Sequence, residues 1–375
     1  MDTIPYGRQF IDDDDILAVS NTLKSDYLTT GNKVLVFEQD LAKYTNAKYV
    51  VALANGTASL HIASLILLKE NDEVLTTVNS FLATSNAILY AKAKPVFIDI
   101  EENGNIDLDL CEQELKKNKN IKALYVVSFS GNTINQDKLK HLRATYDISI
   151  LEDSAHSMGA TYKGIKSASC TNCDISVLSF HPVKHITTAE GGAITTNSKA
   201  IYEKALSLRN HGVIKTQEMK PWEYEMQSLG FNYRLSDIQC ALGSSQLLKL
   251  DGFIKRRIEI AKKYDEAFQN TIVNPLYLYD TCSSYHLYVV KVDFSCLAIS
   301  KQDLFMELRK RNIHIQLHYM PVNKQAYYRR LSYGNEHTPV MDEYYKQCFS
   351  LPIFPKLRDV EQDYVISNLL DILNK

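Results

Sequence analysis

Short runs of apolar, often β-branched residues alternate with amphipathic stretches between residues 49 and 200. Seven of these runs have the length and composition of buried strands: 49–54, 73–77, 95–100, 123–129, 148–151, 174–180 and 192–196. Four stretches between them are typical of helices: 58–69, 80–91, 108–117 and 136–146. The alternation predicts an α/β fold with a mostly parallel sheet covered by helices, in which ligands bind at the carboxyl ends of the strands.

The pattern changes after residue 200 and predicts a smaller C-terminal α/β domain. Its expected elements are helices at 236–250, 252–270, 301–311 and 360–373 and strands at 287–292 and 314–318. We therefore expect three parts: an N-terminal segment, 1–30, near the active site or small domain, a large domain, 31–245, and a small domain, 246–375. The polar segment 212–228 carries the only tryptophan, Trp222, and is expected to be a mobile loop.

Composition narrows the class of protein. The 375 residues are 45% hydrophobic and 23% charged, which is ordinary globular usage. A net charge of −2 argues against nucleic-acid or anionic-membrane partners, and no apolar run approaches the ~20 residues that cross a bilayer. The first residues lack a secretory signal. Together with seven cysteines, an odd number typical of reduced thiols, this predicts a cytoplasmic protein.

Cys170 and Cys173 form a CxxC pair. No second pair follows at the spacing of a zinc site, so we expect no metal. The pair is predicted to lie in a surface loop as two free thiols.

The sequence Ala-Asn-Gly-Thr-Ala-Ser at residues 54–59 follows a predicted strand and opens a helix. Gly56 would let the backbone approach a ligand, and the first N–H groups of the helix would face it at the positive end of the helix dipole. This is an anion site suited to a phosphate. An ordinary strand-to-helix turn with an N-cap would have the same sequence.

Asp153 lies in the sequence Ile-Leu-Glu-Asp-Ser-Ala-His, residues 150–156, at the end of a predicted apolar strand. A buried carboxylate there needs a cationic partner, and a protonated pyridine nitrogen is one. The alternative is that Asp153 is the N-cap of a following helix.

Lys184 lies in Ser-Phe-His-Pro-Val-Lys-His-Ile-Thr-Thr-Ala-Glu-Gly-Gly, residues 179–192. A single lysine is usually a solvated charge. This one follows a buried strand and precedes a Gly-Gly turn, so we expect it to point into the crevice at the strand ends. A desolvated lysine has a lowered pKa and can form a Schiff base. A phosphate cradle, a carboxylate and such a lysine on one sheet are what a pyridoxal phosphate site requires.

With these motifs, the chain resembles the DegT/DnrJ/EryC1/StrS family of nucleotide-sugar aminotransferases over nearly its whole length. Besides residues 179–192, the resemblance rests on four short sequences: Ile-Pro-Tyr-Gly-Arg at 4–8, Ser-Asp-Tyr-Leu-Thr-Thr-Gly at 25–31, Gly-Phe-Asn-Tyr-Arg-Leu-Ser-Asp at 230–237 and His-Tyr-Met-Pro at 318–321. It implies a pyridoxal-phosphate-dependent transferase of fold type I, with a mixed, mostly parallel seven-stranded sheet.

The resemblance also implies roles at the cofactor. Lys184 matches the catalytic Schiff-base lysine, Asp153 the partner of the pyridine nitrogen, and His156 a residue near the ring hydroxyl. Asn232 matches a residue that reaches the cofactor phosphate from the neighbouring subunit, which implies a homodimer with shared active sites. The other matched cofactor residues bind the phosphate or stack on the ring: Gly56, Thr57, Ala58, Ser179 and Phe81.

For the substrates, the resemblance implies L-glutamate as amino donor and a UDP-4-keto-6-deoxy-N-acetylhexosamine as acceptor. The matched pocket residues are Tyr6, Asp26, Tyr27, Leu28, Thr29, Gly56, Ser179, Gln316, His318 and Tyr319. Alternatives stay open here, since His318 could be a satisfied core histidine and residues 26–29 a capped turn.

Three rival functions differ in their sequence requirements. The first is the same reaction on a D-configured UDP-4-keto-6-deoxy-GlcNAc or a dTDP-4-keto-6-deoxy sugar, which residue types do not distinguish. The second, a catalytically silent regulatory subunit, is disfavoured because Lys184, Asp153 and Ser179 are all present. Lysine at 184, where dehydratase relatives have histidine, favours transamination. A nicotinamide dehydrogenase would need GxGxxG, which residues 56–61 lack.

Overall fold

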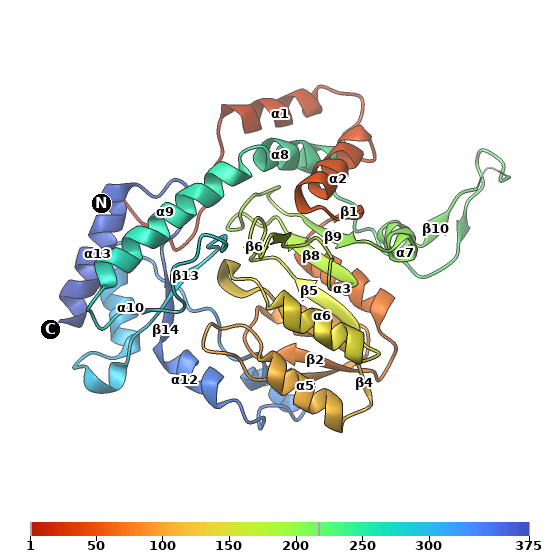
Figure 1. The fold of residues 1–375 in the computed structure, drawn as a ribbon. Coiled ribbons are helices and arrows are strands. Elements are labelled where there is room, and N and C mark those ends of the chain that lie inside the picture. Colours follow the sequence, from red (N-terminus) through yellow and green to blue (C-terminus); the bar gives the residue numbers. More distant parts are fainter. Residues whose placement is uncertain (1, 217, 375) are drawn as a thin grey trace.

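The computed structural model describes residues 2–216 and 218–374. Seven strands form its central sheet: β1 (Tyr49–Leu53), β2 (Glu73–Thr77), β3 (Lys94–Ile98), β4 (Ile121–Val127), β5 (Ser149–Asp153), β8 (Ile175–Ser179) and β9 (Gly192–Thr196). Their order in the sheet is β1-β9-β8-β5-β4-β2-β3 (Figure 1). Neighbouring strands are parallel except at β9, which is antiparallel to β1 and β8. The predicted mixed, mostly parallel seven-stranded sheet is confirmed.

Helices cover both faces of this sheet. One face packs against α3 (Gly56–Leu67), α4 (Leu82–Tyr90) and α7 (Lys199–Arg209). The other packs against α2 (Asn32–Thr45), α5 (Leu108–Lys117), α6 (Gln136–Thr145) and α8 (Asp237–Leu247). Along β4, Ala123 and Tyr125 face the first group, and Leu124 and Val126 face the second. This alternation buries both faces and explains why the strands read as continuous apolar runs.

A second, three-stranded antiparallel sheet has its own core. It consists of β12 (Asn274–Pro275), β13 (Tyr288–Lys291) and β14 (Cys348–Leu351), and it packs with α9 (Leu250–Phe268), α10 (Lys301–Lys310) and α13 (Asp359–Leu373). The N-terminal segment joins this part, because Ile4 bridges Ile313 and is buried in the same core. Helix α1 (Asp13–Leu23) then packs on α8. The division at residues 31–245 and 246–375 stays a prediction.

The strand predicted at 314–318 is wrong. Gln316 makes only an isolated bridge with Ser350 of β14. Two residues later the main-chain oxygen of His318 accepts a hydrogen bond from the Tyr344 hydroxyl, at 2.6 Å, instead of from a strand. Pro321 follows and has no N–H to donate. The carbonyl of His318, which would bond to a neighbouring strand in a sheet, is therefore bonded to the side chain of Tyr344.

The segment 212–228 contains a hairpin and not a plain loop, although residue 217 lies outside the described part. Its strands are β10 (Val213–Ile214) and β11 (Glu225–Met226), which pair antiparallel. Figure 1 shows this hairpin standing off from the body of the molecule. The expectation that no element forms here is therefore wrong.

The two thiols of the CxxC pair are buried, so the predicted surface loop is also wrong. Cys170 and Cys173 belong to the core beneath α5 and α6. The Cys170 thiol lies 3.1 Å from the carbonyl oxygen of Thr195 and donates to it. Both residues fill space as small apolar side chains. The nearby β6 (Thr161–Tyr162) and β7 (Ile165–Lys166) form a short hairpin.

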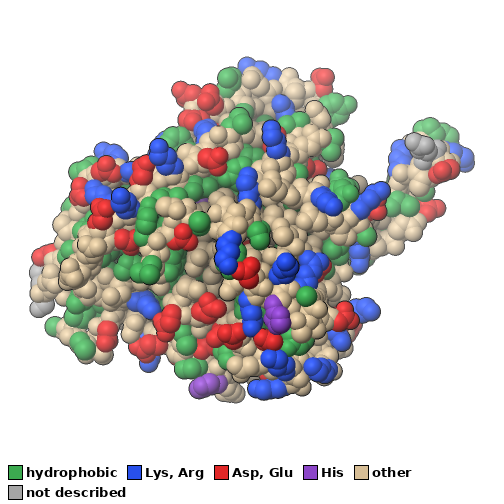
Figure 2. Space-filling view, viewed as in Figure 1, with side chains coloured by type: hydrophobic (Ala, Val, Ile, Leu, Met, Phe, Trp, Pro, Cys, Tyr) green, Lys and Arg blue, Asp and Glu red, His purple; other side chains and the backbone are tan. Residues whose placement is uncertain are grey.

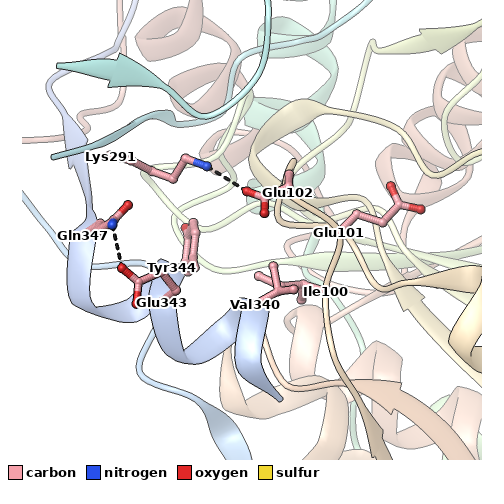
Figure 3. Close-up of a pocket in the computed structure, with 8 residues that line it drawn as sticks. All are labelled: Ile100, Glu101, Glu102, Lys291, Val340, Glu343, Tyr344 and Gln347. Carbon is pink, nitrogen blue, oxygen red and sulfur yellow. Dashed lines mark hydrogen bonds and ion pairs between the residues drawn. The ribbon is translucent and has the colours of Figure 1, made fainter. Parts of the chain in front are cut away.

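Contacts between the two sheets fix the C-terminal part against the strand ends. Asp99 follows β3, and its carboxylate accepts the N–H groups of Val340 and Met341, each at 2.9 Å. It thereby caps α12 (Pro339–Gln347), which α11 (Ala326–Arg330) precedes. Beside it, Lys291 of β13 forms an ion pair with Glu102 at 3.0 Å, across a small cavity (Figure 3).

Within residues 2–216 and 218–374, none of the helices combines the length and the apolar character needed to cross a membrane. The same residues contain no group of three or more His, Cys, Asp or Glu side chains placed to hold a metal ion.

Two helical glycines should respond oppositely to alanine. A Cβ at Gly243 in α8 would lie 2.6 Å from the Cζ atom of the fully buried Phe37, whereas one at Gly252 in α9 would meet nothing within 4 Å. We expect Gly243→Ala to lower the free energy of unfolding by about 1–3 kcal/mol through overpacking. Gly252→Ala should raise it by about 0.5–1 kcal/mol, because alanine loses less backbone entropy in a helix. Chemical denaturation measures both, and equal effects would contradict the packing of α8.

Candidate active site

Three strand-end segments meet at one edge of the central sheet. Asp153 ends β5 and Ser179 ends β8, while Gly56 begins the helix that follows β1. Strand β9 joins the last two, since Gly192 is paired with both Leu53 and Ser179. The sheet order thus brings together residues that the sequence separates by more than a hundred positions.

The turn from β1 to α3 is built for close approach. A Cβ at Gly56 would lie 3.0 Å from the Cβ of Ser179, and one at Gly192 would lie 2.5 Å from the carbonyl of Asn55. Asn55 caps the helix, because its Oδ1 accepts the Ala58 N–H at 2.8 Å. The N–H groups of Gly56 and Thr57, in the first turn, have no partner inside the helix. The turn is therefore capped, as one interpretation expected, while the anion site stays a prediction.

Asp153 is a buried carboxylate without a fixed counterion. Its Oδ2 accepts from the Thr84 hydroxyl at 2.7 Å and its Oδ1 from the Ala155 N–H at 3.1 Å. It forms no ion pair within the described residues, and burial raises its pKa although the charge of Lys184 acts the other way. The bond to Ala155 closes a turn and not an α-helix, so Asp153 is not a helix N-cap. A cationic ring nitrogen would complete this environment.

Lys184 is partly buried in the loop after β8. Its surroundings desolvate the amine and lower its pKa to about 8, while Asp153 opposes that change. The loop is held by its own hydrogen bonds, from the Lys184 N–H to the His181 oxygen and from the Thr188 N–H to the Phe180 oxygen. A lysine with this pKa is partly neutral near physiological pH and can act as a nucleophile or base.

Aromatic side chains gather near this lysine, whose charge acts on His156 and His318. The Tyr319 hydroxyl lies 3.2 Å from Nε2 of His156, and its ring centroid is 6.2 Å from that of Phe81. The ring of His318 is tilted against that of Tyr6, with centroids 5.2 Å apart, and its Nδ1 lies 2.8 Å from the Ser350 hydroxyl. The peptide bond between His318 and Tyr319 is cis. Burial, aided by the charge of Lys184, lowers the pKa of His318 to about 3, so this histidine is neutral.

Several residues matched by resemblance do not join this cluster within one chain. The side chains of Gln316 and Asn232 are exposed, and so is the turn formed by Asp26, Tyr27, Leu28 and Thr29. The turn is fastened to α8, because the main-chain oxygen of Leu28 accepts the N–H of Asp237. Among the described residues, none of these has a hydrogen bond, ion pair or ring contact with Lys184, Asp153 or His156.

Two hollows lie elsewhere on the molecule. The one in Figure 3 has a volume of about 40 Å³, enough for about one water, and is lined by Ile100, Glu101, Glu102, Lys291, Val340, Glu343, Tyr344 and Gln347. A shallower one of about 430 Å³ lies between Phe10 and α9. Neither includes a residue of the strand-end cluster, so neither is a candidate for the site formed by Lys184 and Asp153.

Solved aminotransferases share this fold. Helicobacter pylori PseC, described as an aminotransferase involved in the biosynthesis of pseudoaminic acid, superposes with a TM-score of 0.93 at 32% identity over 99% of both chains. The putative sugar aminotransferase Spr1654 from Streptococcus pneumoniae, in its PLP-form, superposes with a TM-score of 0.90 at 29% identity, again over 99% of both. Fold and strand-end chemistry together define a pyridoxal-phosphate-dependent aminotransferase.

The chain belongs to the DegT/DnrJ/EryC1/StrS aminotransferase family, whose model matches residues 9–370. A relative from Campylobacter jejuni strain 81-176, named UDP-4-amino-4,6-dideoxy-N-acetyl-beta-L-altrosamine transaminase, is 40% identical and covers 99% of this chain and 98% of its own length. Membership implies a glutamate-type amino donor and a nucleotide-sugar substrate.

The depressed pKa of Lys184 predicts a stability effect that depends on pH. Between a folded-state pKa of about 8 and the value of about 10.4 for an unfolded lysine, the unfolded chain binds the extra proton. The stability of the cofactor-free protein should therefore rise with pH across this window. Lys184→Met removes the buried charge and should raise the free energy of unfolding at pH 7 by on the order of 2 kcal/mol.

Chemical denaturation at pH 7 and pH 9.5 measures this effect. Lys204→Met, on the exposed side of α7, is the matched control and should change little. A destabilised Lys184→Met protein, or a gain that does not shrink at the higher pH, would contradict the desolvation of Lys184.

Proposed function

We propose that this chain transfers the amino group of L-glutamate to C4 of UDP-2-acetamido-2,6-dideoxy-β-L-arabino-hexos-4-ulose. The product would be UDP-4-amino-4,6-dideoxy-N-acetyl-β-L-altrosamine, for pseudaminic acid biosynthesis. The choice of acceptor is supported by the name of the full-length Campylobacter jejuni relative. The observation that carries the chemistry is that Lys184, with its lowered pKa in the loop after β8, lies near the buried Asp153 at the end of the adjacent strand β5.

Lys184 would be the catalytic residue. When bound, pyridoxal phosphate supplies the electron sink that stabilises a carbanion. The Nζ atom of Lys184 would take the proton from the α-carbon of the donor and, in the second half-reaction, deliver a proton to C4 of the acceptor sugar. A pKa near 8 suits this exchange, because general acid–base catalysis works best when the pKa lies close to the operating pH.

The other proposed cofactor contacts combine the family resemblance with the positions of these residues near the strand ends. Asp153, oriented by Thr84 and by the Ala155 N–H, would hold the pyridine nitrogen protonated. The remaining proposed contacts are the N–H groups of Gly56 and Thr57 and the Ser179 hydroxyl for the phosphate, Ala58 beside it, Phe81 against the ring face and His156 near the ring hydroxyl. Since the Ala58 N–H is already bonded to Asn55, Ala58 would contribute shape and not a donor.

For the nucleotide sugar, we propose a pocket that one chain builds only in part. Tyr6, His318 and Tyr319 already lie in contact with one another within one chain. Gln316 and the turn of Asp26, Tyr27, Leu28 and Thr29 are exposed and would complete the pocket at its rim. Burial of these apolar and polar side chains by the substrate is consistent with their exposure in the isolated chain.

A homodimer is part of the same proposal. The β10–β11 hairpin exposes large apolar side chains, with Trp222 74%, Tyr224 68% and Leu229 79% accessible. A two-stranded hairpin is not stable on its own, and Figure 2 shows hydrophobic side chains at the tip of this arm. Apolar side chains of this size call for a covering surface, which a second copy would provide. Asn232, at the base of the arm, would then reach the phosphate of the partner's cofactor.

A cytoplasmic location also remains a proposal. It is supported by the seven cysteines, all of which are free thiols.

Single-turnover spectroscopy tests the proposed reaction. The purified protein with pyridoxal phosphate should have the visible absorbance of the lysine-bound cofactor, lose it with L-glutamate and regain it with the β-L-arabino 4-keto sugar. Lys184→Ala should lack both the band and turnover, whereas Lys204→Ala should retain both. Return of the band only with the D-xylo epimer or a dTDP-linked sugar would disprove the acceptor assignment. A Lys184→Ala protein that still turns over would disprove the role of Lys184.

Sedimentation velocity tests the dimer. Trp222→Glu introduces a charge where the proposed interface has an aromatic anchor, and loss of such an anchor weakens association by about 2 kcal/mol, or about thirtyfold in Kd. Leu278→Glu, at another exposed apolar position, is the control and should leave the dimer intact. A wild-type monomer, or a Trp222→Glu protein that is as dimeric as the control, would contradict the proposal.

A further inference from the structure

Three buried histidines stand together behind the strand-end cluster. They are His156, His185 and His286, and each is less than 5% exposed. The ring centroids of His156 and His286 are 4.3 Å apart, and those of His286 and His185 are 5.5 Å apart. In all three rings the Nδ1 atom is buried and has no hydrogen-bond partner among the described residues.

The hydrogen bonds define which nitrogen carries the proton. Nε2 of His185 lies 3.1 Å from the carbonyl oxygen of Ser284. A carbonyl oxygen only accepts, so Nε2 carries the hydrogen and Nδ1 carries the bare lone pair. In His156 the Nε2 side reaches the Tyr319 hydroxyl. A hydrogen on its covered Nδ1 would be a buried donor without an acceptor, which is more costly than an unused lone pair.

His286 is fixed against His156 by its backbone. Nη1 of the fully buried Arg257 donates to the carbonyl oxygens of Tyr285 and His286, at 3.1 and 3.2 Å. On the other side, the N–H of Leu287 donates to the Ser130 oxygen. Gly131 allows this approach, since a Cβ there would lie 2.5 Å from the Tyr285 nitrogen. The chain on both sides of His286 is therefore held, which fixes the point from which its ring reaches His156.

We propose that His286 is a positioning residue for amino transfer, which keeps the neighbouring His156 in its neutral Nε2–H form. Its ring is the nearest aromatic neighbour of His156, closer than Phe129 at 5.9 Å or Tyr319 at 6.1 Å. His286 offers no acceptor to Nδ1 of His156. A side chain at position 286 that did so would let this nitrogen take up a proton. The inference rests on the proposed function, in which His156 faces the ring hydroxyl of the cofactor. There it would be a permanent hydrogen-bond donor, which favours the ionised form of that hydroxyl.

The charges around His156 act in the same direction. Burial lowers its pKa well below the ordinary value, and the charge of Lys184 lowers it further. Of the groups on other elements, His286 has its ring centroid 4.3 Å from that of His156, and the Tyr319 hydroxyl lies 3.2 Å from its Nε2. Asp153, at the end of β5, is engaged by Thr84. Two effects therefore keep His156 in its neutral Nε2–H form: its Nδ1 is buried without an acceptor, and its surroundings disfavour a positive charge on the ring.

Nitrogen NMR of histidine-labelled, cofactor-free protein tests the inference directly. Two-bond correlations report the tautomer and charge of each ring between pH 6 and pH 9, and the His156 signal is assigned by its loss in His156→Gln. We expect wild-type His156 to be the neutral Nε2–H form throughout. His286→Leu should leave it so, whereas His286→Asn should move hydrogen to Nδ1 or make the ring titrate. His141→Asn, at an exposed position on α6, is the matched control.

A wild-type His156 that is Nδ1–H or charged at pH 7 would overturn the inference, and so would a folded His286→Asn protein with an unchanged His156. Should His286→Asn not fold, the wild-type spectrum and His286→Leu still decide.

The absorbance of bound pyridoxal phosphate gives a second readout. Its apparent pKa should shift by about one unit, tenfold in the ionisation constant, in His286→Asn and not in His286→Leu. An equal shift in both variants would show that His286 only packs. Failure of the wild type to bind pyridoxal phosphate would instead disprove the proposed function, while the tautomer measurement would stand.

Discussion

Asp153 is buried at the end of β5 with neutral hydrogen-bond donors and no fixed counterion, and the site is organised around this constraint. A carboxylate in such a place destabilises the folded chain unless a cation joins it. Lys184, the nearby amine whose charge influences Asp153, is itself desolvated, so its pKa falls to about 8. Among the described residues the two groups form no ion pair, so neither charge is neutralised by the other. Binding a cationic ring at Asp153 and a carbonyl at Lys184 would relieve both, which explains why stability is given up at these positions.

Contacts between distant segments hold these two desolvated groups in place. Asp99 caps α12 from the other sheet, and Arg257 fixes the backbone beside His286. Gly192 and Gly131 permit backbone approaches that any side chain would prevent. The wall of the site is therefore rigid, while the surfaces that would meet the substrate and a second subunit remain exposed. A preorganised interior with an open rim suits an enzyme that exchanges two substrates at one lysine.

Local signals in the sequence predict the part of the fold in which each element is specified by its own residues. Strands β2 and β9 and helix α5 have the predicted bounds, because buried β-branched runs and an amphipathic repeat identify them. Other elements depend on distant partners. The start of α12 is capped by Asp99, some 240 residues earlier, and pairing at Gln316 is ended by Tyr344. The buried CxxC thiols likewise follow from packing under α5 and α6. Helix α2 was missed although Val34, Phe37 and Leu41 repeat at helical spacing.

The residues of the candidate site also fall into two groups: those that the local sequence identifies and those that depend on distant contacts. Asp153 and Ser179 could be predicted because each ends a strand, Gly56 because it opens a helix, and Lys184 because it lies in the loop after β8, at the edge where an α/β sheet binds ligands. Thr84 and Arg257 could not, because their importance arises from contacts across 28 to 69 residues of chain. His286 could not either, because it meets His156 across 130 residues. Asn232 and the turn at residues 26–29 are exposed and lie outside the cluster within one chain, so their roles at the site stay predictions.

The proposed role of Lys184 can be tested by identifying the residue to which the cofactor is attached. The protein would be loaded with pyridoxal phosphate, reduced with borohydride to make the bond to lysine permanent, digested and sequenced by mass spectrometry. We predict that the added mass lies on Lys184. It should be absent in Asp153→Ala protein loaded at low cofactor concentration. Modification of another lysine, or none at saturating cofactor, would contradict it.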